Sequence, residues 1–403
     1  MATTKRWQAQ RWVLDNIIRT VGVDWDQGRS FYLQAPCGTD AFADFQGLRQ
    51  RIQKFGDIAR EFGRAAARRE RLACQAEQEG HTVSAREHFF VASILYGGAQ
   101  WPIFENTPEN VRLNAKKVEM YEQFIRLADR PVRRVEIPFE GKSLPAYLHL
   151  PPGVDRPPVV LAIDGMDGFK EMMVSLNGDK LLERGIAVLA IDGPGQGECT
   201  VRDIHVSGDN FRLAGRAALN WLRQQPELDA ERIAVEGVSF GSYWATLVAA
   251  EDEHLAGCAV AFVCHEPSGH TIFNLASPTF KLRFMYMAGY ADEDEFDSFA
   301  QSISLKGVGQ QVRCPYLVIA GEDDELSPIE HTYVLLDDMT CPRELMVYQG
   351  EKHGLNTTTS SFLGPNWSGW MADWLSDRLQ GKTAPSREVF VELTGQTRLR
   401  DWN

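Results

Sequence analysis

Hydrophobic positions recur at helical spacing through about the first 130 residues of the chain. Val118, Tyr121 and Ile125, for example, follow one another at intervals that place them on one helix face. We predict helices over residues 50–76, 84–95 and 111–128, the second opening with a Ser-Ala-Arg-Glu capping box at Ser84. Strand signals are scarce in this part, so we expect a separate helical unit.

The pattern changes near Arg130 and Pro131. Residues 135–139 and 144–150 alternate between apolar and polar and flank a turn, which predicts a β-hairpin. Short apolar runs then follow, most of them before a helix-like stretch, at residues 159–163, 186–191, 233–235, 259–263, 316–320 and 345–348. Continuous apolar strands alternating with helices indicate a mostly parallel central sheet with helices on both faces.

We therefore expect two domains: residues 1–131 as a helical N-terminal domain and residues 132–403 as an α/β domain. The tail, residues 381–403, is polar except for one short apolar stretch at 389–391. The pattern leaves open whether this tail packs on the core or extends toward a partner.

The composition is that of an ordinary globular protein, with 403 residues, 44% hydrophobic and 24% charged. A net charge of −13 argues against a nucleic-acid-binding surface. No run approaches the roughly 18 apolar residues of a membrane span. The seven cysteines show neither a CxxC pair nor a metal-ligand spacing, so we expect reduced thiols in the cytoplasm and no metal.

The stretch Gly237-Val238-Ser239-Phe240-Gly241 lies between a predicted strand and a helix-like run. A serine on a sharp strand-to-helix turn has its hydroxyl held above the sheet edge, with backbone N–H groups and the positive helix end nearby. Flanking glycines are needed because side chains there would collide with the neighbouring strand and helix. We expect Ser239 to be a nucleophile rather than part of an ordinary turn.

Residues 192–198 follow the second parallel strand and are dense in glycine. The density resembles a dinucleotide-binding loop, but Pro194 and the absence of a helix start argue against that reading. We expect no cofactor.

Two further groups follow later strands: Asp324 lies in the run 321–328 and His353 in Lys-His-Gly at 352–354. A serine hydroxyl needs a base, and histidine can take its proton while a carboxylate fixes the histidine tautomer. Asp323 competes for the carboxylate role, and His265 and His270 also lie near strand ends. We favour Asp324 from its position in the motif and His353 because it follows the last strand.

The chain order of serine, aspartate and histidine, with these three motifs, resembles the α/β-hydrolase superfamily over about residues 133–380. The resemblance implies an α/β-hydrolase fold and an oxyanion hole made by the N–H groups of Phe240 and Met166. Many members carry His-Gly where this chain has Asp164-Gly165. A backbone donor needs no particular side chain, so Asp164 is left without a role.

The helical unit and the Gly-x-x-x-x-Lys-Glu run from Gly165 to Glu171 are similar to the FrsA-like, or 2,6-dihydropseudooxynicotine hydrolase-like, group. Its members include hydrolases of carbon–carbon bonds beside ketones, esterases and fungal polyketide-shortening enzymes. The resemblance implies that the helical unit caps the active site and that the protein is a homodimer. Glu266 is then the nearest candidate for steering a proton in carbon–carbon cleavage, with a structural role beside Pro267 equally open.

These observations predict a serine hydrolase that acts on a small-molecule carbonyl substrate through an acyl-enzyme, by preference cleaving a carbon–carbon bond next to a ketone. A carboxylesterase is the first alternative, since the same three residues serve esters and amides. A non-catalytic binding or regulatory protein is the second, because a fold does not fix a function. A prolyl-oligopeptidase-like peptidase is disfavoured, since the sequence has no propeller repeats.

Overall fold

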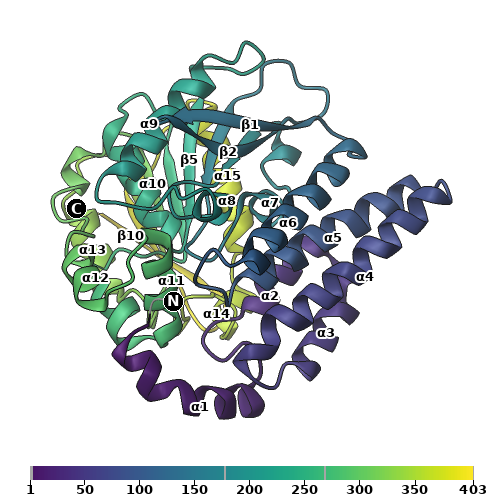
Figure 1. Cartoon of the computed structure of the whole chain (residues 1–403). Coiled ribbons are helices and arrows are strands. Elements are labelled where there is room, and N and C mark those ends of the chain that lie inside the picture. Colours follow the sequence, from purple (N-terminus) through teal and green to yellow (C-terminus); the bar gives the residue numbers. More distant parts are fainter. Residues whose placement is uncertain (1–2, 177, 267–268, 403) are drawn as a thin grey trace.

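The computed structural model describes residues 3–176, 178–266 and 269–402 (Figure 1). At its centre is a ten-stranded sheet with the order β1-β2-β4-β3-β5-β6-β7-β8-β9-β10. The strands are β1 Val132–Phe139, β2 Lys142–His149, β3 Val159–Ile163, β4 Ala187–Ile191, β5 Ile233–Val238, β6 Cys258–Ala261, β7 Tyr316–Gly321, β8 Arg343–Tyr348, β9 Arg387–Val391 and β10 Thr397–Asp401.

The strands from β3 to β9 run parallel, while β1, β2 and β10 pair antiparallel at the two sides. Every residue of β3 and β4 is buried, as expected for runs of Val, Leu, Ile and Ala covered on both faces. After β4 the chain crosses to the other side of β3 to form β5. The loops after β3 and β5 therefore meet at a topological switch point, where ligands bind in open α/β sheets.

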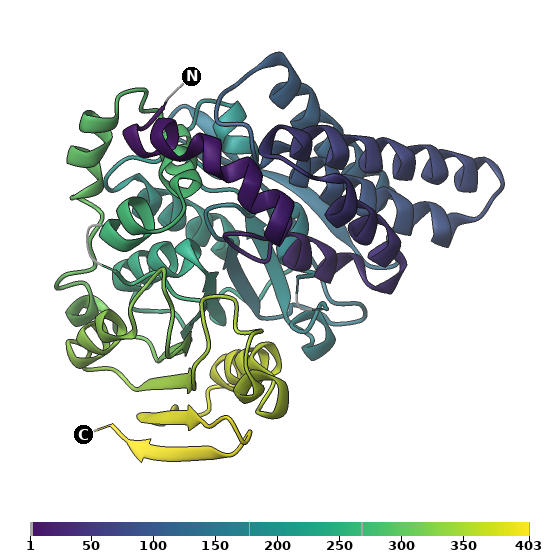
Figure 2. The ribbon, with the colours of Figure 1, turned by 90° about the horizontal axis from the view of Figure 1, so that it is seen from below.

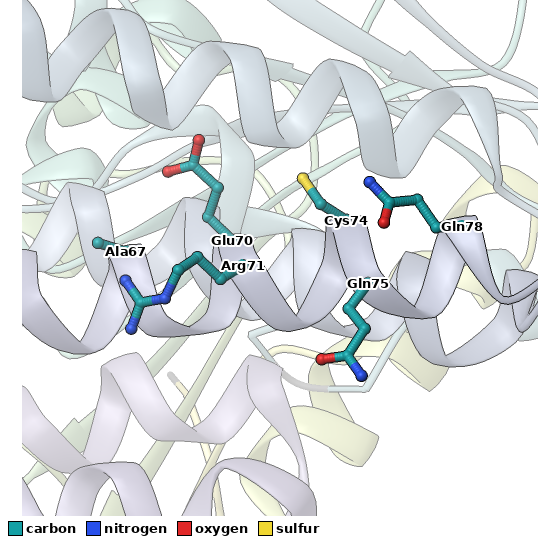
Figure 3. A pocket seen from close by; sticks show the side chains of 6 residues that line it. All are labelled: Ala67, Glu70, Arg71, Cys74, Gln75 and Gln78. Carbon is teal, nitrogen blue, oxygen red and sulfur yellow. The ribbon is translucent and has the colours of Figure 1, made fainter.

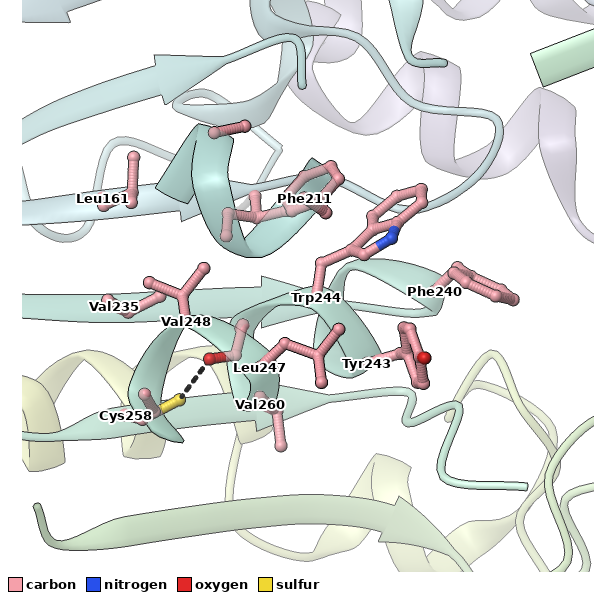
Figure 4. Packing of buried hydrophobic residues seen from close by; sticks show 14 of the residues in the cluster. Leu161, Phe211, Val235, Phe240, Tyr243, Trp244, Leu247, Val248, Cys258 and Val260 are labelled. Atoms are coloured by element: carbon pink, nitrogen blue, oxygen red, sulfur yellow. Dashed lines mark hydrogen bonds between the residues drawn. The ribbon is translucent and has the colours of Figure 1, made fainter. Parts of the chain in front are cut away.

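Helices cover both faces of the sheet. On one face, α9 and α10 pack around the stacked rings of Phe211 and Trp244, 4.3 Å apart (Figure 4). On the other face, α15 contributes Met371 and Leu375. The helices that follow β3 are α7 Lys170–Met173, α8 Gly197–Val201, α9 Asn210–Arg223, α10 Phe240–Glu251, α11 Pro278–Ala288, α12 Glu293–Ala300, α13 Ile329–Asp337, α14 Thr359–Leu363 and α15 Trp367–Leu379, with 3-10 turns at Leu182–Arg184 and Gly309–Gln311 and a π-helical turn at Thr271–Leu275.

The helical unit precedes β1, and its hairpin of α4 and α5 extends away from the sheet (Figures 1 and 2). Its helices are α1 Lys5–Val21, α2 Arg29–Gln34, α3 Phe42–Arg51, α4 Ile58–Gln78, α5 Thr82–Gln100 and α6 Pro108–Arg126, with 3-10 turns at Ala35–Cys37, Thr39–Ala41 and Phe55–Asp57. Its hydrophobic cluster also includes Tyr147, Phe169 and Leu282 from the rest of the chain. The division at residues 131 and 132 that we predict falls between α6 and β1.

The structure corrects two of the helix predictions and answers the question that the sequence leaves open for the tail. Helix α4 begins at Ile58, so the segment 50–76 is not one helix, because the chain turns between α3 and α4. The predicted capping box is wrong: α5 begins at Thr82, which leaves Ser84 inside the helix, and no side chain caps it. The tail forms β9 and β10, which extend the sheet beyond β8 (Figure 2).

Within the described ranges, none of the helices combines the length and the apolar character that a membrane crossing requires.

Candidate active site

The turn between β5 and α10 holds Ser239 in a strained conformation with φ 53°. A Cβ on Gly237 would collide with the carbonyl of Gly241, and a Cβ on Gly241 would collide with the carbonyl of Ile163. The N–H of Ser239 donates to the Ala261 carbonyl at 3.0 Å, which ties the turn to the neighbouring strand. These contacts explain why glycine occupies both flanking positions.

The side chains of Ser239, His353 and Asp324 form a continuous hydrogen-bonded line. The Oγ atom of Ser239 lies 2.9 Å from Nε2 of His353, and Nδ1 of His353 lies 2.8 Å from Oδ2 of Asp324. The aspartate follows β7 and the histidine follows β8, so both come from the carboxyl edge of the sheet. The two side chains are buried, while Ser239 is half-buried and keeps access to solvent.

The second oxygen of Asp324 is held by the backbone. Its Oδ1 atom accepts from the N–H groups of Leu326 at 2.8 Å and Ser327 at 3.2 Å. Asp323, the competing carboxylate, is exposed to solvent. His265 is buried, with its Nδ1 atom 3.1 Å from Oγ1 of Thr332. His270 is exposed to solvent. The structure thus brings together Ser239, Asp324 and His353, and not their competitors.

Two opposing effects act on the pKa of His353. Burial lowers it, and the neighbouring Asp324 carboxylate raises it by charge and by hydrogen bonding. The net result is a pKa above the ordinary histidine value. A histidine in this state is a stronger base than an isolated one.

Two backbone N–H groups flank the serine. The N–H of Phe240 is the first of α10 and therefore has no acceptor within the helix. On the other side, a Cβ on Gly165 would lie 2.9 Å from Cβ of Ser239, so the loop after β3 passes directly against the nucleophile. The next residue, Met166, is buried, and its N–H donates to no backbone carbonyl in the described part of the chain.

Glu266 lies in the loop after β6 and is 5% exposed. Burial raises the pKa of its carboxyl, although the backbone N–H groups of Thr271 and His270 act in the opposite direction. The Oε2 atom has no hydrogen-bond partner among the described residues. The charges of Glu266 and Asp324 both help burial to raise the pKa of the Cys264 thiol. Pro267, its neighbour in sequence, lies outside the described residues.

The segment between β6 and β7 packs over the side chain of Phe240. The ring of Phe284 on α11 lies 4.7 Å from that of Phe240, and the ring of Phe273 lies 6.4 Å away. Helix α1 reaches this segment, where Arg6 donates to the Ala276 carbonyl at 2.7 Å. Sequence reasoning missed this aromatic group, because its residues are spread over a stretch that carries no motif.

The helical unit also contacts the loop after β3. Arg29 on α2 donates to Asp167 at 2.7 Å and pairs with Asp26. The Nε atom of Arg283 on α11 lies 3.7 Å from the other oxygen of Asp167. All four side chains are buried, so an ion cluster links the helical unit to the residue beside Met166.

The Lys-Glu run found in the sequence forms a second buried cluster. The Nζ atom of Lys170 donates to Glu171 at 2.8 Å, to Asp192 at 3.0 Å and to Glu198 at 2.9 Å. Burial lowers the pKa of Lys170, but the three carboxylates outweigh it and the net pKa is raised. Lys117 on α6 lies 3.4 Å from the far oxygen of Glu171, so this cluster too reaches the helical unit.

A hollow on the helical unit is separate from these residues (Figure 3). It is lined along α4 by Ala67, Glu70, Arg71, Cys74, Gln75 and Gln78. None of these residues lies on the loops at the carboxyl edge of the sheet, so this hollow is not part of the candidate active site.

Residues 54–339 match the family model described as esterase FrsA-like. The chain is 27% identical over 357 residues to 2,6-dihydropseudooxynicotine hydrolase of Paenarthrobacter nicotinovorans, which covers 86% of this chain and 91% of that protein. It is 28% identical to esterase FrsA of Vibrio cholerae, over 63% of this chain and 62% of that protein.

The crystal structure of 2,6-dihydroxy-pseudo-oxynicotine hydrolase superposes on this chain with a TM-score of 0.73. The identity is 26%, and the superposition covers 87% of this chain and 97% of that chain. This likeness, with the observed sheet order, confirms the α/β-hydrolase fold with a helical region ahead of it.

Proposed function

The chain belongs to the esterase FrsA-like family of hydrolases, and from this premise we propose that it cleaves a small-molecule carbonyl substrate through an acyl-enzyme on Ser239. The preferred target is a carbon–carbon bond next to a ketone. The observation that carries the proposal is the hydrogen-bonded line from Ser239 through His353 to Asp324, with contacts of 2.9 and 2.8 Å.

In the first half-reaction, Oγ of Ser239 attacks the substrate carbonyl while Nε2 of His353 takes its proton. The N–H groups of Phe240 and Met166 hold the negative oxygen of the tetrahedral intermediate. Collapse breaks the bond to the leaving group, which receives the proton, and leaves an acyl-enzyme. In the second half-reaction His353 activates water, which attacks the acyl carbon and releases the acid and Ser239.

A carbon leaving group makes a stricter demand than an alkoxide, because it departs only as a stabilised carbanion or enol. The substrate class is therefore a β-diketone, a vinylogous acid or an electron-rich aryl ketone. Glu266 is suited to steer the proton from His353 to such a carbon, since it is buried with a raised pKa and an unpartnered oxygen. The name of the relative from Paenarthrobacter nicotinovorans supports the preference for this class over simple esters.

Ester hydrolysis is the second candidate, favoured by the relative named esterase FrsA. A binding or regulatory role without turnover is the third. We also propose that the protein works as a cytoplasmic homodimer without cofactor or metal; the seven cysteines, all free, fit a reducing compartment.

The test is a substrate panel of 4-nitrophenyl esters, β-diketones and aryl ketones, run with the wild type and with Ser239→Ala. We expect turnover of diketones or aryl ketones to exceed that of esters in kcat/KM, and to disappear in the variant. Retained turnover in Ser239→Ala would refute the assignment. A wild type that neither turns over any compound nor reacts with a fluorophosphonate would favour the binding role.

A further inference from the structure

We propose that Gln196 is a positioning residue that holds the peptide between Gly165 and Met166, so that the Met166 N–H points to the oxyanion. The glycine-dense loop at residues 192–198 is then part of the catalytic apparatus and not a nucleotide site. This inference rests on the proposed serine mechanism and assigns the part of the chain that builds one half of its oxyanion hole.

The side chain of Gln196 is fully buried and spans the two loops that follow β3 and β4. Its Nε2 atom donates to the Asp164 carbonyl at 2.5 Å and to the Gly165 carbonyl at 3.0 Å. Its Oε1 atom accepts from the N–H of Gly193 at 3.1 Å. The amide orientation follows from these partners, because carbonyls only accept and a backbone N–H only donates.

The Gly165 carbonyl belongs to the same peptide group as the Met166 N–H. A peptide group is planar and trans, so its C=O and N–H point in opposite directions in one plane. Holding the oxygen therefore fixes the direction of the N–H. Only one other donor, the Gly168 N–H at 3.3 Å, reaches this oxygen among the described residues.

The loop that carries Gln196 is itself fixed. Asp192 accepts from the backbone N–H of Lys170 at 2.8 Å and from that of Glu198 at 2.8 Å, besides the ammonium of Lys170. A Cβ on Gly193 would collide with Phe211, and one on Gly197 with Asp192. The glycines thus let the loop pack closely enough for Gln196 to reach the loop after β3.

Gln196 could also act only as a buried group that stabilises the fold. The two roles differ in what they change: a positioning residue alters stabilisation of the transition state, and a purely structural residue alters the free energy of unfolding. The experiment therefore uses Gln196→Met, which keeps the length of the side chain and removes all three hydrogen bonds.

Four quantities are measured for Gln196→Met: kcat and KM on a 4-nitrophenyl ester, the rate of fluorophosphonate labelling, and the affinity for an aryl trifluoromethyl ketone. That ketone adds Ser239 to form a hemiketal with a negative oxygen, so its affinity reports on the oxyanion hole. We expect kcat and ketone affinity to fall together by about 10- to 100-fold, less than the loss of a whole donor, while KM changes by less than about threefold.

Ser93→Ala is the matched control, because Ser93 is also fully buried and donates to a carbonyl, that of Lys117, at 2.8 Å. It should lower the melting temperature without changing kcat. Equal losses of kcat in Gln196→Met and Ser93→Ala, or wild-type kcat and ketone affinity in Gln196→Met, would overturn the inference.

If Gln196→Met does not fold, Gln196→Glu decides. A protonated glutamic acid can donate to one carbonyl, whereas its anion repels both, so the activity of this variant relative to wild type should rise as the pH falls. A ratio that does not change with pH would overturn the inference. Ser239→Ala keeps the two levels apart: activity surviving in it refutes the serine mechanism, whereas a dead Ser239→Ala beside an unaffected Gln196→Met refutes only the role of Gln196.

Discussion

Two hydrogen-bonded networks with buried charges lie next to residues 165–171, and they differ in whether they reach solvent. The line from Asp324 through His353 ends at a hydroxyl that is half-buried and can reach a substrate. The cluster around Lys170 has an enclosed centre, because its ammonium is surrounded by three carboxylates and has no exposed surface. Strong hydrogen bonds occur in both networks, so bond strength does not identify a reactive group. A reactive group is identified by an accessible side chain at the end of the network that can exchange a proton.

The largest effect on kcat should come from removing the hydroxyl of Ser239. If Ser239 is the nucleophile as proposed, Ser239→Ala should lower kcat by about a millionfold, because the residual rate then comes only from substrate binding and the proposed oxyanion donors. Kinetics on the best compound of the panel measure it, with circular dichroism melting as a control for folding. A reduction of tenfold or less would place the chemistry elsewhere.

Asp324→Asn tests the buried end of the same line. The amide can hold His353 in the wrong tautomer, so we expect kcat to fall by about ten-thousandfold with little change in the melting temperature. Asp323→Asn is the matched control, because that neighbour is exposed, and it should behave as wild type. Similar losses in both variants would contradict the choice of Asp324.

Substitution in the cluster around Lys170 should change the stability of the protein. Lys170→Met leaves Asp192 buried without a paired cation, although Lys117 still faces Glu171 and Arg134 and Arg202 still pair with Glu198. The free energy of unfolding should therefore drop by about 3–5 kcal/mol in urea denaturation. Lys281→Met is the comparison, since Lys281 is also buried but one of its partners, Asp297, is 43% exposed. Its loss should be about 1 kcal/mol. Equal losses of unfolding free energy in Lys170→Met and Lys281→Met would contradict the contrast between an enclosed ammonium and one with an exposed partner.

Glu266→Gln tests whether a second carboxyl group takes part in the reaction beside that of Asp324. It removes the carboxyl that is proposed to steer the proton to carbon and keeps the shape of the side chain. We expect turnover of a β-diketone or aryl ketone to fall by about 100-fold while ester turnover stays within about threefold. Parallel losses on both substrate types would assign Glu266 a structural role.

The pH dependence gives the smallest and most specific effect. His353 must be neutral to accept the serine proton, so kcat/KM should fall as the pH drops through its pKa, which lies above the ordinary 6.5. Removing the charge of Asp324 takes away what raises this pKa, so the acid limb of Asp324→Asn should move to lower pH. An unmoved acid limb would mean that another group controls the profile.

The sequence predicts structure most accurately at positions where only one type of residue can be accommodated. The strands β3 and β4 are recognisable because they are apolar throughout, and the glycines around Ser239 because no side chain fits there. The order of Ser239, Asp324 and His353 after successive strand ends predicts that they meet, because parallel strands share one carboxyl edge.

The features that the sequence does not predict depend on contacts between residues that are far apart in the chain. Arg29 and Asp167 are 138 residues apart in the chain, and neither stands in a motif that points to the other. The sequence does not single out Gln196, because the glycine density of its loop suggests only a nucleotide site, and Pro194 argues against that. The apolar stretch at 389–391 lies in β9, but the sequence does not predict β10, because β10 is exposed at all five positions and has no apolar pattern.

The hydrophobic cluster shared by the helical unit and the sheet has a consequence for how this protein can be divided. Tyr147 of β2, Phe169 in the loop after β3 and Leu282 of α11 are all buried against the N-terminal helices. A fragment beginning at β1 would turn these side chains toward water and invite aggregation. The border near residue 131 therefore separates two architectures but not two independently stable pieces.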